Sequence, residues 1–218
     1  MGEVILVRPG QTSFDEQNRI QGMLDLPLSE RGRQHIHSVA DQLRALPLDV
    51  ILTDPGEPAR TTAQQLGEML DVPVKEKTEL RNLDQGLWQG LQLDDVRRMY
   101  PKLLKQWQEH PETICPPEGE PVCNAMRRVG AVLKKPLKKY DRMVIVAADP
   151  LATLIAGMLR GLKPDFRGPM CSHAECCVQR FSTDPLPTRE EIESADNGRP
   201  LPAYQATALA SYGHEFGA

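Results

Sequence analysis

Short apolar runs alternate with amphipathic stretches along most of this chain. Three of the runs are continuous, rich in β-branched residues and bounded by polar residues, which is the pattern of strands buried on both faces. We expect such strands at residues 3–8, 49–53 and 142–148. A fourth, later run predicts a strand at 176–181.

The segments between these runs carry apolar residues at helical spacing. Ser29 is a suitable N-cap for a helix over 30–45, and Gly161 is a suitable C-terminal stop for an apolar helix over 151–159. A further helix is expected over 57–70. Strands that alternate with helices predict an α/β fold with three layers, in which helices cover both faces of a mainly parallel sheet.

Two regions depart from this alternation. Residues 80–119 contain both tryptophans and four prolines, and we expect an inserted subdomain or lid there, with its aromatic side chains used for packing. Residues 182–218 form a proline-rich tail in which residues 188–191 begin one short helix with a capping box. The tail is expected to pack on the domain, to wrap a neighbouring subunit in a homodimer, or to be partly disordered.

The composition fits one globular domain of 218 residues, with 40% hydrophobic residues and a net charge of -4. This charge gives no indication of a nucleic-acid partner. No apolar run reaches the roughly 18 residues of a membrane span, and the N-terminus lacks the basic region of a signal peptide. Five irregularly spaced cysteines favour reduced thiols and a cytoplasmic location.

One cluster has the residue types of a metal site, but it overlaps the late strand. It comprises Cys171, His173, Cys176 and Cys177. The spacing fits a plain buried strand better than paired zinc ligands, so we expect neither a metal nor another cofactor.

Short motifs follow one another in a consistent order. The first strand leads into Arg8-Pro9-Gly10-Gln11-Thr12. Further motifs lie at residues 18–32, 53–63, 80–90, 119–128 and 144–149. Together they resemble, over residues 2–181, the histidine phosphatase superfamily of phosphoglycerate mutase-like proteins. The resemblance implies a phosphoglycerate mutase-like domain over residues 1–181 and a phosphoryl-transfer pocket at the ends of the strands.

The resemblance also implies five chemical groups, of which this sequence retains one. The first phosphate-binding arginine falls on Arg8, whereas the nucleophilic histidine falls on Pro9 and the second arginine on Pro58. The acid that protonates the leaving group falls on Asn82, and the second histidine on Ala148. The sequence therefore predicts a catalytically inactive relative, a pseudoenzyme with a binding or scaffold role toward an unknown protein or small molecule.

Three carboxylates take the place of uncharged family residues around the implied pocket. They are Asp15, Asp54 and Asp149. We expect Arg8 to form a structural ion pair with such a carboxylate rather than to bind an anion, and His173 to lie at the pocket rim. Two alternatives stay open: an enzyme that uses these acids or a metal on a phosphorylated or other small substrate, and a non-catalytic anion sensor that uses Arg8.

Overall fold

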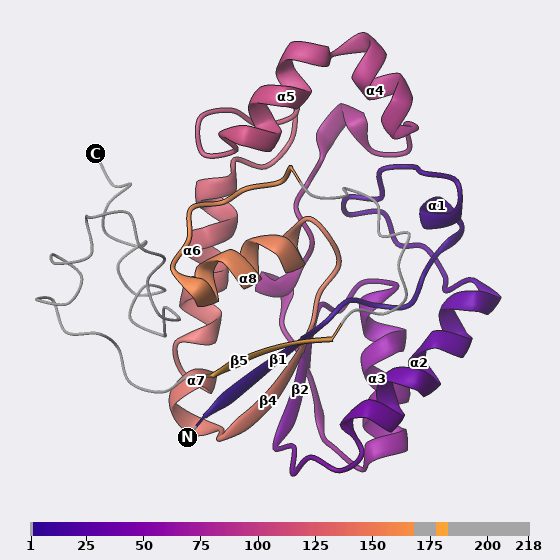
Figure 1. Ribbon diagram of the computed structural model, residues 1–218, viewed down its shortest axis with the longest axis vertical. Helices are drawn as coiled ribbons and strands as arrows, with labels where there is room; N and C mark the ends of the chain where they lie inside the picture. Colours follow the sequence, from indigo (N-terminus) through magenta and orange to yellow (C-terminus); the bar gives the residue numbers. More distant parts are fainter. Residues whose placement is uncertain (1, 168–177, 183–218) are drawn as a thin grey trace, which may run out of the picture.

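The computed structural model describes residues 2–167 and 178–182. Its centre is a five-stranded sheet in the order β3-β2-β4-β1-β5 (Figure 1). The strands are β1 (Glu3–Val7), β2 (Val50–Thr53), β3 (Val74–Glu76), β4 (Arg142–Val146) and β5 (Val178–Ser182). Neighbours pair in parallel except β5, which runs antiparallel to β1 at the edge.

Helices cover both faces of the sheet. One face packs on α2 (Glu30–Leu43) and α3 (Ala59–Leu70), and the other on α6 (Val122–Leu133) and α8 (Leu151–Arg160). Alternate residues of each strand divide between the two apolar cores, because successive side chains point to opposite faces. In β1, for example, Ile5 belongs to one core and Leu6 to the other. The predicted three-layer α/β fold with a mainly parallel sheet is confirmed.

Residues 80–119 form a short helical region beyond one end of the sheet (Figure 1). It contains η2 (Gly86–Trp88), α4 (Leu93–Met99) and α5 (Pro101–Glu109), and η1 (Thr78–Leu80) precedes it. Trp88 and Trp107 are fully buried and belong to the same apolar core as the sheet residues. The expected packing role of these aromatic residues is confirmed.

Several predicted boundaries were wrong by a few residues. The helix that begins after Ser29 was predicted to reach residue 45, whereas α2 ends at Leu43. Pro58 and Pro150 precede α3 and α8 as N-caps rather than lying in the first turn. Proline is tolerated there because the first turn of a helix leaves its N–H groups unpaired in any case.

The remaining differences concern elements that were not predicted and the end of the chain. The sequence pattern missed the 12-residue helix α6 and three elements of three or four residues, which are β3, α1 (Ser13–Glu16) and α7 (Pro136–Lys139). The late strand begins at Val178, and Gly161 ends α8 in the left-handed conformation, as expected. His173, the cysteine cluster and the tail lie outside the described residues. Within residues 2–167 and 178–182, no helix has the length and apolar character that crossing a membrane requires.

Candidate functional site

A pocket lies where β1 and β4 end, because parallel neighbours bring their carboxyl ends to the same edge of the sheet. We call it the central pocket. Its described lining residues are Arg8, Pro9, Gly10, Gln11, Asp15, Arg19, Gln21, Pro58, Ala148 and Asp149. Its volume is about 30 Å³, which is room for a water molecule or two. Four of the five positions singled out from the sequence therefore line one pocket.

Backbone contacts fix the Arg8–Thr12 loop in place. The N–H of Gly10 donates to Thr62 Oγ1 over 3.1 Å, and that hydroxyl donates to the carbonyl of Pro58 over 2.9 Å. On the other side, the N–H of Ser29 donates to the carbonyl of Gln11 over 2.8 Å. The loop is thus attached both to the start of α3 and to the start of α2.

Arg8 forms an ion pair with Asp149 inside the central pocket. Its Nε donates to Asp149 Oδ2, and its Nη2 donates to Asp149 Oδ1 over 3.3 Å and to Thr153 Oγ1 over 3.4 Å. The side chains of Arg8 and Asp149 are 18% and 7% exposed. The ion pair expected from the sequence is confirmed, with Asp149 as the partner.

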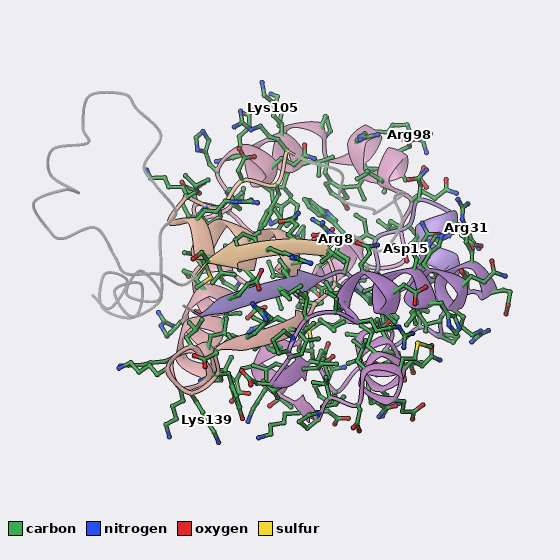
Figure 2. All side chains as sticks on the ribbon, turned by 60° about the horizontal axis from the view of Figure 1, so that its bottom comes forward. Arg8, Asp15, Arg31, Arg98, Lys105 and Lys139 are labelled. Carbon is green, nitrogen blue, oxygen red and sulfur yellow. The ribbon has the colours of Figure 1, made fainter. Side chains whose placement is uncertain are left out.

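Asp15 lines the same pocket, and Figure 2 labels it beside Arg8 at the end of the sheet. Its Oδ2 accepts hydrogen bonds from the N–H of Thr12 over 2.7 Å and from Thr12 Oγ1 over 2.8 Å, which makes a capping box for α1. Burial raises the pKa of Asp15, and the nearby negative charge of Asp149 acts in the same direction. The pocket therefore contains two carboxylates, and the charge of Asp149 disfavours the ionisation of Asp15.

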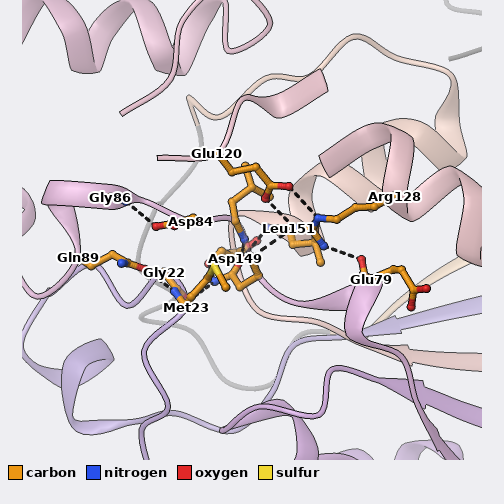
Figure 3. Close-up of polar contacts among 12 residues, drawn as sticks. Gly22, Met23, Glu79, Asp84, Gly86, Gln89, Glu120, Arg128, Asp149 and Leu151 are labelled. Atoms are coloured by element: carbon orange, nitrogen blue, oxygen red, sulfur yellow. Dashed lines mark hydrogen bonds and ion pairs between the residues drawn. The ribbon is translucent and has the colours of Figure 1, made fainter. Parts of the chain in front are cut away.

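Asn82 is buried behind the pocket residue Asp149 and joins three segments. Its partners Gly22, Asp149 and Leu151 are labelled in Figure 3. Its Nδ2 donates to the carbonyls of Gly22 and Asp149 over 3.0 and 2.8 Å. Its Oδ1 accepts from the N–H groups of Leu83 and Leu151 over 2.9 and 3.2 Å. Every polar atom of this buried amide is used, so Asn82 is a structural crosslink at the position where the family resemblance implies an acid.

Arg128 supports the segment that carries Asn82. It forms an ion pair with Glu120 over 2.8 Å and donates to the carbonyls of Glu79 and Asn82 over 2.5 and 3.3 Å (Figure 3). These contacts hold the chain on both sides of Leu80, which is fully buried. Arg128 and Glu120, which the resemblance included among its motifs, therefore stabilise the region behind the pocket.

Asp54 does not line the central pocket. It is buried, and its Oδ1 accepts the N–H of Gly56 over 2.8 Å at the turn after β2. Burial raises the pKa of Asp54. The expectation that Asp54 lines the pocket beside Asp15 and Asp149 was wrong, because the turn directs its carboxylate to its own backbone. Among residues 2–167 and 178–182, no three His, Cys, Asp or Glu side chains are placed to hold a metal ion.

Some pocket residues were not singled out from the sequence. Arg19 lines the pocket, and its Nη1 donates to the carbonyl of Gly90 over 2.7 Å, so it also connects the α1 loop to the η2 region. Gln11 and Gln21 complete the polar lining. Thr153 does not line the pocket but contacts both Arg8 and Asp149. It follows Asp149 by four residues, and this helical spacing is a sequence signal that could have identified it.

Solved structures with the same architecture are found among phosphatases. The mycobacterial glucosyl-3-phosphoglycerate phosphatase in complex with VO3 superimposes with a TM-score of 0.68 at 28% identity, over 75% of this chain and 83% of that one. YhfR of Bacillus stearothermophilus superimposes with a TM-score of 0.72 at 24% identity, over 84% of this chain and 92% of that one, which is a likeness of fold.

Sequence comparison also finds phosphatases among the relatives of this chain. Phosphoserine phosphatase 1 of Hydrogenobacter thermophilus is 28% identical over 162 residues, which is 73% of this chain and 77% of that protein. Glucosyl-3-phosphoglycerate phosphatase of Mycobacterium tuberculosis is 35% identical over 118 residues, about half of each chain. The profile of the histidine phosphatase superfamily (branch 1) matches residues 4–189. The chain therefore belongs to the histidine phosphatase superfamily.

Proposed function

We propose that this protein is a non-catalytic member of its family, in which the phosphatase scaffold serves to bind a partner. The observation that carries the proposal is the lining of the central pocket. Pro9, Pro58 and Ala148 line it, and none of them has a nucleophilic, acidic or cationic side chain. Asn82 behind the pocket has every polar atom engaged in the fold.

The chemistry of phosphoryl transfer supports this assignment. A covalent route needs a nucleophile, and its transition state needs positive groups around the phosphoryl oxygens. Among the residues that line the pocket, the cations are Arg8 and Arg19, and Arg8 is paired with Asp149. Removing the nucleophile of an enzyme typically costs about 10^6-fold in rate. The remaining groups do not replace that loss.

Phosphatase activity is the alternative that an experiment must exclude, because the named relatives are phosphatases. We expect the purified protein to hydrolyse neither p-nitrophenyl phosphate nor 3-phosphoglycerate above the buffer rate. The matched variant Arg8→Ala distinguishes intrinsic activity from a contaminant. Activity in the wild-type protein that is lost in Arg8→Ala would contradict the proposal.

A reverted variant tests whether the missing groups are the cause. It combines Pro9→His, Pro58→Arg, Asn82→Glu and Ala148→His with Asp149→Gly, which frees Arg8 from its ion pair. We expect measurable hydrolysis of p-nitrophenyl phosphate by this variant and none by a control with Asp149→Gly alone. Equal activity in the control and the reverted variant would show that these four positions do not account for inactivity.

A further inference from the structure

We propose that Asp149 is a built-in carboxylate ligand of Arg8 that closes the central pocket to phosphate and phosphate esters. This inference rests on the proposed non-catalytic function and adds a specificity to it. The central pocket therefore selects against dianionic ligands such as phosphate, which an unshielded arginine in a pocket would attract. The group responsible is the carboxylate of Asp149, which belongs to the protein itself and lies two residues before the start of α8.

The first step is the way in which Asp149 meets Arg8. A guanidinium presents its N–H groups as a planar fork that matches two oxygens of a carboxylate or a phosphate. Both oxygens of Asp149 contact Arg8, one at Nε and one at Nη2. The carboxylate therefore uses one of the two edges of the guanidinium that offer paired hydrogen bonds, the edge formed by Nε and Nη2.

The second step is the support behind Asp149. Its Oδ1 accepts the N–H of Thr153 over 3.2 Å and Thr153 Oγ1 over 2.8 Å, and its carbonyl accepts from Asn82. Side chain and backbone are thus held from α8 and from the segment behind the pocket. An external anion competes with a tethered group, whose effective concentration can reach the millimolar range or above.

The third step is the space and charge that remain. The volume of about 30 Å³ is room for a water molecule or two, whereas a phosphate ion carries four oxygens around its phosphorus. Asp15 also lines the central pocket and adds a second carboxylate to it. A phosphate that enters the pocket meets repulsion from Asp15 and Asp149 before it can reach the Arg8 guanidinium.

The test measures binding of inorganic phosphate and orthovanadate to the full chain by titration calorimetry and thermal shift. We expect no saturation of the wild-type protein at low millimolar phosphate. In Asp149→Asn, which keeps the shape of the side chain and removes its charge, we expect binding at least about tenfold tighter, a change equivalent to about 1.4 kcal/mol. Asp149→Gly, which also removes the side chain, should bind phosphate at least as tightly as Asp149→Asn.

Two control variants separate the ion pair from the general charge of the pocket. Asp15→Asn removes one negative charge from the same lining without freeing Arg8, so it should gain much less affinity than Asp149→Asn. Arg8→Met combined with Asp149→Asn should lose the gained affinity. Thr153→Val removes the hydroxyl contact to Asp149 Oδ1 and keeps the contact of the backbone N–H, so it should produce a smaller gain than Asp149→Asn.

Three results would overturn the inference: equal phosphate affinity in wild type and both Asp149 variants, an equal gain in Asp15→Asn, or a gain that survives Arg8→Met. If Asp149→Asn does not fold, Asp149→Gly and Thr153→Val decide the question. Failure of the inference is distinguishable from failure of the proposed function. Turnover by the wild-type protein that depends on Arg8 would contradict the function, whereas unchanged affinity in inactive Asp149 variants contradicts only the role of Asp149.

Discussion

The side-chain amide of Asn82 connects the segments behind the pocket, and its removal should be costly. In Asn82→Ala the buried carbonyls of Gly22 and Asp149 lose their donor, and the N–H of Leu151 loses its acceptor. Each unsatisfied buried polar group costs about 1–3 kcal/mol, so we expect the free energy of unfolding to fall by about 2–4 kcal/mol. Urea denaturation followed by circular dichroism measures the change.

The control for this prediction is Asn124→Ala. Asn124 is an exposed asparagine of α6 that bonds Arg127 at the surface, so its loss should change stability by less than about 0.5 kcal/mol. Asn82→Asp places a carboxylate oxygen against two carbonyl oxygens and should destabilise more than Asn82→Ala. Similar stabilities for Asn82→Ala and Asn124→Ala would contradict the role assigned to the Asn82 amide.

The carboxyl group of Asp15 should make stability depend on pH. Its pKa is raised by burial above the ordinary value of 3.8, so the folded chain holds this proton more tightly than the unfolded chain does. Between 3.8 and the raised pKa, the stability contributed by Asp15 therefore falls as pH increases. Asp15→Asn cannot ionise, so its stability relative to wild type should be greater at pH 7 than at pH 3.5.

Urea titrations of both proteins at several pH values measure this difference. Asp94→Asn is the matched control, because the Asp94 side chain is 84% exposed and pairs only with Arg97 on the helix surface. That variant gives the change that replacing an exposed carboxyl produces over the same pH range, and the change for Asp15→Asn should exceed it. A difference for Asp15→Asn that stays constant from pH 3.5 to pH 7 would show that burial does not perturb this carboxyl.

Contacts between side chains of the central pocket were predictable from the sequence only where the order of the motifs places both side chains at that pocket. The pairing of Arg8 with a carboxylate was predicted because the family resemblance places Asp15, Asp54 and Asp149 around the same pocket as Arg8. Asp54 is one of these carboxylates, yet its side chain bonds the turn at Gly56. Three of the four bonds of Asn82 join positions 60 to 69 residues apart, and sequence spacing carries no signal for such distances.

At the level of elements, two helical glycines should respond to alanine in opposite directions. A Cβ on Gly32 in α2 would lie 2.2 Å from the carbonyl oxygen of Gln11, so the helix or the pocket loop must move. A Cβ on Gly157 in α8 would meet Leu162 at an ordinary 3.7 Å. Overpacking costs about 1–3 kcal/mol, whereas an unstrained Gly→Ala change inside a helix gains up to about 1 kcal/mol.

We therefore expect Gly32→Ala to lower, and Gly157→Ala to raise, the free energy of unfolding in the same urea assay. The two substitutions add the same methyl group to a helix, so each serves as the control for the other. Equal effects would mean that the contact between α2 and the Gln11 backbone is loose. That contact also positions the loop containing Arg8, which links the packing of α2 to the geometry of the pocket.

Helices and strands were predictable where apolar residues repeat over several turns or form a continuous run. The strands at β1, β2 and β4 and the helices α2, α3 and α8 were predicted within a few residues. Helix α6 also carries apolar residues at helical spacing, from Val122 to Leu133, and was nevertheless missed. The short β3 has one half-buried and two exposed residues, so it lacks an apolar signal of its own. It exists because β2 offers it a parallel edge, which is a tertiary effect that local pattern does not contain.

For the whole molecule, the order of the motifs predicted the fold, but the pattern alone left the status of residues 80–119 open. The expectation of an inserted lid implies a part that could move or unfold by itself. In the structure, Trp107 of α5 lies 5.8 Å from Trp88 and 4.7 Å from Phe166, measured between ring centres. These rings belong to the apolar core that also contains Leu6 and Ile145 of the sheet.

Because of this shared core, we expect residues 80–119 to unfold together with the rest of the domain. Both tryptophans of the chain, Trp88 and Trp107, lie in residues 80–119, so intrinsic fluorescence reports on that region, while far-ultraviolet circular dichroism reports on all helices and strands. We expect the two signals to give the same urea midpoint and the same slope, as two-state unfolding requires. Trp107→Leu should move the midpoint of the circular dichroism transition to lower urea, since it removes packing from the common core. A fluorescence transition that precedes the circular dichroism transition would instead identify residues 80–119 as an independently unfolding lid.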